Sequence, residues 1–345
     1  MRLKGWLAAV VVLCASQARG QQLPCLHEDA LARAASRLIA SEGPATAQTV
    51  GSAARAEGSD LVDVEALVVP GEGHKRIRAW LLELRRRSDA MLVCGRAQGL
   101  GQTLVLAAAR GGALGVGTER RATNGSLRLW GRLAPGFHTP AIVLADSRGE
   151  LQRFVPEAAE LARGFLLPLP LLPAHIQLVA TGPVGPRPVA ERIVGAARAD
   201  AGFGAALLFN PLRPFNSPHR SPKLLLAELR ERARLPRLRH NRLLAELAAR
   251  QAERVCREGR VAHELTPGAG PRNRLARARV RARLVGEALA RARTPALAFS
   301  ALARSPSHRM SLSDRRFTDV GVGSAVDAQG RCCLAIVLAA WPRFM

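Results

Sequence analysis

The sequence predicts a multidomain α+β protein, and three observations support this fold class. The chain has 345 residues, more than one hydrophobic core usually serves. The pattern of apolar residues changes along its length. Helix and strand patterns mix over residues 21–120, short apolar runs follow over residues 121–197, and residues 221–341 are strongly helical. Residues 198–220 are rich in Pro, Gly, Asn and Phe, so we expect a linker there.

Residues 1–20 are expected to be a secretory signal peptide. They combine a basic start (Arg2, Lys4), an apolar stretch from Trp6 to Ala15 and small residues before Gln21. The apolar stretch is too short for a comfortable membrane span, although a retained N-terminal anchor helix is an alternative. The sequence therefore predicts export, to the extracellular space or to the periplasm and cell envelope.

The region 21–120 is predicted to be α/β. Helices are indicated by the apolar spacing of residues 28–40 and 77–87, and strands by residues 61–69, 90–94 and 102–108. Gly95, Gly99 and Gly101 suggest a phosphate-binding loop at first sight. The stretch lacks the lysine and the Ser or Thr of a nucleotide loop, so a hairpin turn is the better interpretation.

The region 121–197 is predicted to be a small β-sandwich, because several short strands are separated by regular turn signals. The expected strands are residues 127–133, 141–145, 164–169, 176–180 and 189–194. An immunoglobulin-like sandwich would also suit this spacing, but the cysteine–tryptophan signature is missing. We find no internal sequence repeat in the chain.

Five cysteines remain once the expected signal peptide is removed, and disulfides are the default expectation in an exported protein. Cys25 and Cys94 are expected to pair. Cys256 is expected to pair with either Cys332 or Cys333, which leaves one thiol over. Neighbouring residues of a strand point to opposite faces, so only one of the two can face a given partner.

The formal net charge of +24 is carried almost entirely by arginine. The arginines are scattered through expected helices, and no nucleic-acid motif or aromatic stacking platform accompanies them. We therefore expect nonspecific attraction to anionic polymers and no specific nucleic-acid binding.

Residues 221–341 contain clear helix and strand signals. Ser221 and Pro222 open a helix that runs to about residue 234, and Asn241 caps a second helix that ends before Gly259. Thr294 and Pro295 start another helix, and residues 332–340 form a final apolar strand.

Five short motifs in this region resemble those of the CAP superfamily, which comprises cysteine-rich secretory proteins, antigen 5 and pathogenesis-related 1 proteins. They are Leu235–Leu238, His263, Gly286–Glu287, Ser305–Arg309 and Thr318–Gly323, and their order and gaps are most similar to the bacterial branch. The resemblance implies an α–β–α sandwich over residues 221–341, with a sheet of three or four strands between helical layers.

The resemblance also implies a cleft lined by His263, Glu287 and His308, which in the family sometimes holds a divalent metal. Two imidazoles and a carboxylate suit zinc. The sequence departs from the family in two ways, and each leaves the expected cleft with fewer polar groups. Ala288 stands where the family has asparagine, and residues 265–274 contain no carboxylate. A buried hydrogen-bonded cluster without metal is therefore a competing interpretation of the three residues.

The leading functional hypothesis is a secreted or envelope-associated binding protein for a lipid, a peptide or an envelope polymer, with no catalytic residue assigned. A divalent-metal-dependent hydrolase that uses His263, Glu287 and His308 is the alternative. A structural envelope protein held in place by its basic charge is the second alternative.

Overall fold

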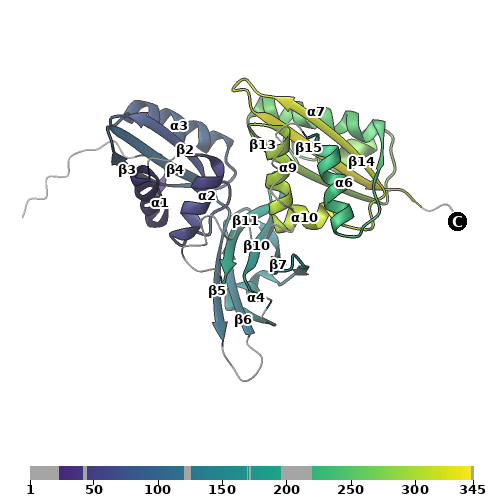
Figure 1. Ribbon diagram of the computed structural model, residues 1–345, viewed down its shortest axis with the longest axis horizontal. Coiled ribbons are helices and arrows are strands. Elements are labelled where there is room, and N and C mark those ends of the chain that lie inside the picture. The colour runs from purple at the N-terminus through teal and green to yellow at the C-terminus, as the bar shows by residue number, and fades with distance from the viewer. Residues whose placement is uncertain are drawn as a thin grey trace, which may run out of the picture.

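The structure is a computed structural model that describes residues 23–41, 45–119, 126–168, 170, 172–195 and 220–342. It has a mixed α/β architecture with helices and several sheets, arranged in three groups of elements (Figure 1). The expected signal peptide and nearly all of the expected linker lie outside the described residues.

The N-terminal group is a four-stranded sheet with helices on both faces. Its order is β1-β3-β4-β2, with β1 at Leu26–His27, β3 at Met91–Gly99, β4 at Gln102–Arg110 and β2 at Glu65–Pro70. Helices α1 (Asp29–Ala40) and α2 (Ala47–Ala56) pack on one face, and α3 (His74–Arg87) packs on the other. The helices expected at 28–40 and 77–87 are confirmed.

The glycine-rich stretch forms the hairpin between β3 and β4. Gly99 pairs with Gln102, and Leu100 and Gly101 both have positive φ angles, 52° and 71°. Positive φ at both central residues suits a tight two-residue turn between antiparallel strands. The predicted hairpin is confirmed, and Cys94 of β3 is disulfide-bonded to Cys25 as expected.

The second group consists of two antiparallel sheets that share one core, and we refer to it as the sandwich. One sheet is β5-β6-β9 (Gly112–Glu119, Ser126–Leu133, Phe165–Pro168). The other is β11-β10-β7-β8 (Gly185–Val194, Ala174–Gly182, His138–Ala145, Leu151–Phe154), and helix α4 spans Ala158–Arg163. Leu114 and Leu129 of the first sheet pack with Ile142 and Leu178 of the second. Strand β5 precedes the boundary drawn at residue 121, so this group extends further toward the N-terminus than the strand pattern indicated.

The C-terminal group is a sheet between two helical layers. The sheet order is β12-β14-β15-β13, with β12 at Arg239–His240, β14 at Asp319–Val326, β15 at Cys332–Ala340 and β13 at Leu284–Ala292. The helices are α6 (Pro222–Arg232), α7 (Arg242–Glu258), α8 (Pro271–Arg277), α9 (Pro295–Arg304) and α10 (Pro306–Leu312). Asn241 and Thr294 accept the expected cap hydrogen bonds, and Gly259 ends α7 in the left-handed conformation.

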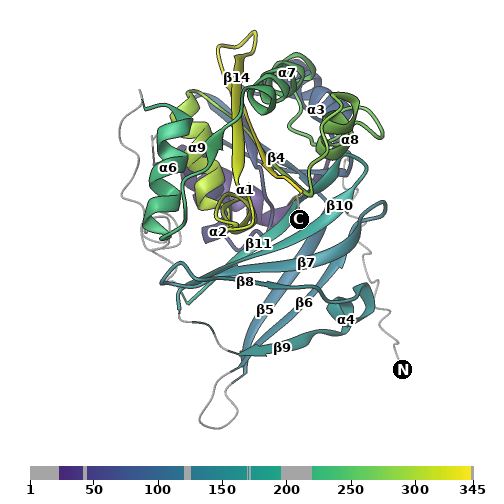
Figure 2. The ribbon, with the colours of Figure 1, turned by 90° about the vertical axis from the view of Figure 1, so that its right-hand side faces the viewer.

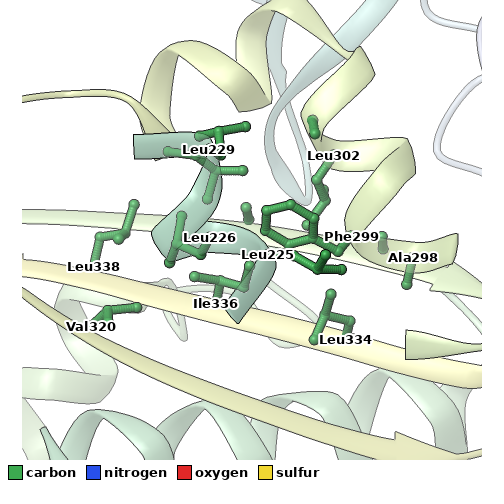
Figure 3. Packing of buried hydrophobic residues seen from close by; sticks show 14 of the residues in the cluster. Leu225, Leu226, Leu229, Ala298, Phe299, Leu302, Val320, Leu334, Ile336 and Leu338 are labelled. Atoms are coloured by element: carbon green, nitrogen blue, oxygen red, sulfur yellow. The ribbon is translucent and has the colours of Figure 1, made fainter. Parts of the chain in front are cut away.

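Strand β15 is buried along its whole length because helices cover both of its faces. Leu334, Ile336 and Leu338 face α6 and α9 and belong to the same core cluster as Phe299 (Figure 3). The intervening residues face α7, and one of them, Cys333, is bonded to Cys256. Cys332 faces the opposite layer and is a buried free thiol. The alternation along the strand thus decides the pairing that the sequence left open.

The N-terminal sheet repeats the topology of the C-terminal sheet. In both, a two-residue strand pairs in parallel with the first strand of the hairpin, and the remaining strand pairs antiparallel with the second. The register agrees as well: His27 pairs with Cys94 and His240 with Val320, and the next residues are Gly95 and Gly321. A Cβ on either glycine would overlap the backbone of the helix above it, α1 or α7. The chain therefore contains a structural repeat that its sequence does not reveal.

Candidate functional site

The three residues expected to line the cleft come from three different elements. His263 lies in the loop after α7, Glu287 lies on β13, and His308 lies on α10. Helix α9 ends at Arg304 and Pro306 starts α10 at once, so His308 lies within a short helix that follows the expected helix end. Three separate elements therefore supply the three side chains.

Glu287 is the centre of an ion-pair cluster in which both of its carboxylate oxygens have partners. Its side chain has no exposed surface, and its Oε1 lies 2.8 Å from Nδ1 of His263. The Arg274 guanidinium donates to Oε2 of Glu287, to the carbonyl oxygen of His263 (2.8 Å) and to that of Ala269 (2.6 Å). A buried carboxylate requires such partners, so Arg274 and His263 stabilise the charge of Glu287.

His308 lies near this cluster without a hydrogen bond to Glu287. Its Nδ1 is 2.8 Å from the Oγ of Ser305. Burial and, secondly, the charge of His263 lower the pKa of His308 from 6.5 to about 4. His308 is therefore neutral at pH 7. The structure joins His263 directly to Glu287 and places His308 beside them, with a separate partner.

The sandwich closes over the His263 side of this cluster. The backbone N–H of Glu264 donates to the carbonyl oxygen of Val184, at 3.0 Å, in the turn between β10 and β11. Val184 is 7% exposed and packs in the C-terminal core with Ala262 and Leu265. Figures 1 and 2 show β10 and β11 running from the sandwich toward the C-terminal group.

The sandwich also contacts the start of α10, through Gln177 of β10. The Oε1 of Gln177 accepts hydrogen bonds from the hydroxyl of Ser305 (3.0 Å) and from the hydroxyl and backbone N–H of Ser307 (2.9 and 3.1 Å). Its Nε2 donates to Glu191 at 3.2 Å, and Glu191 pairs with Arg55 of α2 at 2.7 Å. A polar network therefore connects all three groups of elements and ends beside His308.

Glu191 remains charged within this network although it is buried. Burial alone would raise the pKa of its carboxyl. Hydrogen bonds from His175 and Gln177 and the positive charge of Arg55 outweigh burial and lower the pKa to about 2.

The side chains of the expected zinc site already have other partners. Both oxygens of Glu287 are engaged, by His263 and Arg274, and Nδ1 of His308 is engaged by Ser305. Across the described ranges, no three His, Cys, Asp or Glu side chains are grouped so that they could hold one metal ion. These residues thus do not fit a three-ligand zinc site in the observed arrangement. Zinc binding by His263, Glu287 and His308 stays a prediction, which metal analysis can test.

Sequence reasoning missed three residues that define the site: Arg274, Gln177 and Val184. The missing carboxylate in residues 265–274 was a signal for Arg274, because a buried Glu287 without a metal needs a cation from elsewhere. No local signal could have indicated Gln177, whose partner Ser307 is 130 residues away in sequence.

These features define a three-layer α–β–α unit, crosslinked by a disulfide, whose candidate site is a buried His–Glu–Arg cluster. Residues 224–338 match the cysteine-rich secretory protein family, CAP. The C-terminal third of the chain is therefore a CAP domain, as its motifs predicted.

Several solved structures are similar to this chain. An outer surface protein from Borrelia burgdorferi is 21% identical over 35% of this chain and 90% of its own, with a TM-score of 0.33. An extracellular protein containing an SCP domain from Bacillus anthracis is 18% identical over 65% of this chain and 67% of its own, with a TM-score of 0.33. A cysteine-rich secretory protein from Staphylococcus aureus is 12% identical over 66% and 83%, with a TM-score of 0.29. No curated protein matches the chain.

None of the helices in the described part of the chain combines the length and hydropathy that a membrane span requires.

Proposed function

We propose that this protein is an exported, non-catalytic binding protein that attaches to an anionic polymer of the cell envelope through its CAP domain. The observation that carries the proposal is an arginine-rich surface on α8 and the loop that follows it. Five arginines in this segment are exposed: Arg272, Arg277, Arg279, Arg281 and Arg283. The buried cluster at Glu287 supports the non-catalytic part, because its polar groups are already paired with one another.

The arginine-rich surface lies in a stretch of the sequence that has no acidic residues. Residues 265–286 contain no Asp or Glu. Elsewhere many arginines are paired, such as Arg232 with Glu228 and Arg316 with Asp314. Within the described residues, none of the five exposed guanidinium groups has a carboxylate within 4 Å. Unpaired guanidinium groups at this density attract phosphate, sulfate or carboxylate groups of a polymer.

The proposal is tested by binding the full exported chain to heparin, a sulfated polymer, as a function of salt concentration. The test variant is Arg277→Glu/Arg279→Glu/Arg281→Glu. The control is Arg76→Glu/Arg78→Glu/Arg85→Glu, which makes the same charge change at exposed positions of α3. Flexible polyanions lose about 0.7 in the slope of log K against log salt for each contact removed. We therefore expect the slope to fall by about 2 for the test variant and much less for the control.

An equal loss in the two variants would contradict the proposal, because it would show that net charge, and not this surface, drives binding. Undiminished binding by the test variant would contradict it as well. Anionic lipid vesicles and a single-stranded oligonucleotide, used as additional probes, separate a membrane or nucleic-acid partner from a polymer of the envelope.

A further inference from the structure

We infer that the part of the CAP domain around His263 and the start of α10 is the docking site for the β10–β11 turn of this same chain, so that an external ligand reaches the His263–Glu287 pair only when the turn withdraws. This inference is independent of the proposed polymer-binding surface. It rests on two separate attachments, one at His263 and the other at the start of α10.

The first attachment is an apolar anchor with a backbone hydrogen bond beside it. Val184 leaves the sandwich and is 7% exposed among CAP core residues, including Ala262. The Glu264 N–H donates to the Val184 carbonyl at 3.0 Å. The residue before His263 thus shares a core cluster with Val184, and the residue after it is hydrogen-bonded to Val184.

The next residue of the turn shows how closely it approaches the site. Gly185 has a φ of 98°, and a Cβ at this position would lie 3.0 Å from the Cβ of His263. A side chain there would be strained by its backbone and crowded by the histidine. Glycine therefore allows the turn to lie directly against His263.

The second attachment is at the start of α10, beside His308. Gln177 accepts three hydrogen bonds from Ser305 and Ser307, and Ser305 is the partner of His308. The Arg309 guanidinium also donates to the carbonyl oxygen of Gly149, at 3.3 Å, in the turn between β7 and β8. His263 and His308 are therefore each next to a residue that the β10–β11 strand pair contacts.

The polar cluster beneath the turn is largely shielded from solvent. Glu287 has no exposed side-chain surface, and the side chains of Arg274 and His263 are 11% and 15% exposed. A cleft that awaits a diffusing ligand is concave and accessible. Here the chain's own turn lies against His263 and Glu264, which makes the sandwich an internal partner of the CAP domain.

The test is Val184→Lys in the full exported chain, with Val155→Lys as the matched control. Val155 is in the same sandwich but is 58% exposed. Two measurements report directly on whether the β10–β11 turn lies over His263: hydrogen exchange of the Glu264 amide and carbethoxylation of His263. We expect both to be about tenfold or more faster in Val184→Lys and unchanged in the control, because local opening sets both rates.

The exposed residues His27 and His74 serve as internal references for the chemical modification. The inference is overturned if His263 of the unmodified protein reacts as fast as these two. It is also overturned if Val184→Lys keeps native circular dichroism and leaves both rates unchanged. Should Val184→Lys fail to fold, Val184→Ala removes part of the same apolar contact with less disruption. Unchanged rates of Glu264 amide exchange and His263 carbethoxylation in that folded variant would equally refute the inference that the turn covers His263. Heparin binding is measured in parallel, and its persistence in an opened variant keeps the two proposals separable.

Discussion

Arg274 provides the sharpest test of the buried cluster. Substitution by methionine keeps much of the stem volume and removes the guanidinium. The Glu287 carboxylate, with no exposed surface, then loses its pairing with arginine, and the carbonyl oxygens of His263 and Ala269 lose their donor. Removing one partner of a buried ion pair costs about 3–5 kcal/mol, because the remaining charge is left uncompensated. We therefore expect Arg274→Met to lower the free energy of unfolding of the CAP domain by that amount.

A double-mutant cycle separates this charge effect from a simple loss of packing. Glu287→Gln removes the charge that Arg274 balances, so the double variant should be more stable than the sum of the single effects predicts, by about 2 kcal/mol. The matched control is Arg272→Met on the same helix, an exposed position expected to change stability by less than about 0.5 kcal/mol.

Calorimetry is the suitable assay, since the chain has several cores that need not unfold in one transition. Additive effects in the cycle, or a cost of less than about 1 kcal/mol for Arg274→Met, would refute the interpretation of the cluster as a balanced buried charge.

Three further outcomes are expected. The stability that neutral His308 contributes is complete above pH 6.5 and is lost as the pH falls toward about 4, because the unfolded chain takes up the proton first. The loss in the free energy of unfolding is at most about 3 kcal/mol. The variant His308→Gln should remove this part of the pH dependence. Metal analysis after incubation with zinc should find less than one zinc ion per chain, and the same amount in His263→Ala. One tightly bound zinc ion per chain that is absent from His263→Ala would instead support the metal hypothesis. Thiol titration without reductant should detect no thiol in the native exported chain and one after denaturation, since Cys332 is buried. Cys256→Ser removes the disulfide bond to Cys333 and should lower the free energy of unfolding by about 2–5 kcal/mol.

The elements that depend on nearby residues were predictable from the sequence. Asn241 and Gly259 mark the ends of α7 because capping acts within one helical turn, and the pattern of β15 is readable because both of its faces are buried. The CAP domain was likewise predictable from five motifs in order.

The parts that depend on distant residues were not predictable. Cys333 could not be chosen over Cys332 because the strand pattern does not say which face α7 covers. Hydrogen bonds between Gln177 and Ser307 have no spacing to detect, since they join separate groups of elements. The partner of Glu287 was open for the same reason: an ion pair needs proximity in space and imposes no sequence period. The sequence thus indicated the CAP framework and two of the contacting residues, His263 and Glu287, but gave no information on the cover.

The repeat of sheet topology bears on what the buried cluster does. The N-terminal sheet has the strand order of the CAP domain, with the same close approach of a helix to a glycine, Gly95 or Gly321. Yet β2, the counterpart of β13, has only apolar residues after Glu65, and the N-terminal sheet is layered between helices all the same. A sheet of this order therefore does not need a buried Glu–Arg pair, which apolar residues can often replace without loss of stability. The cluster lies beside the loop that the β10–β11 turn contacts, since His263 belongs to both, so its presence is tied to the local arrangement of that loop and not to the strand order of the sheet.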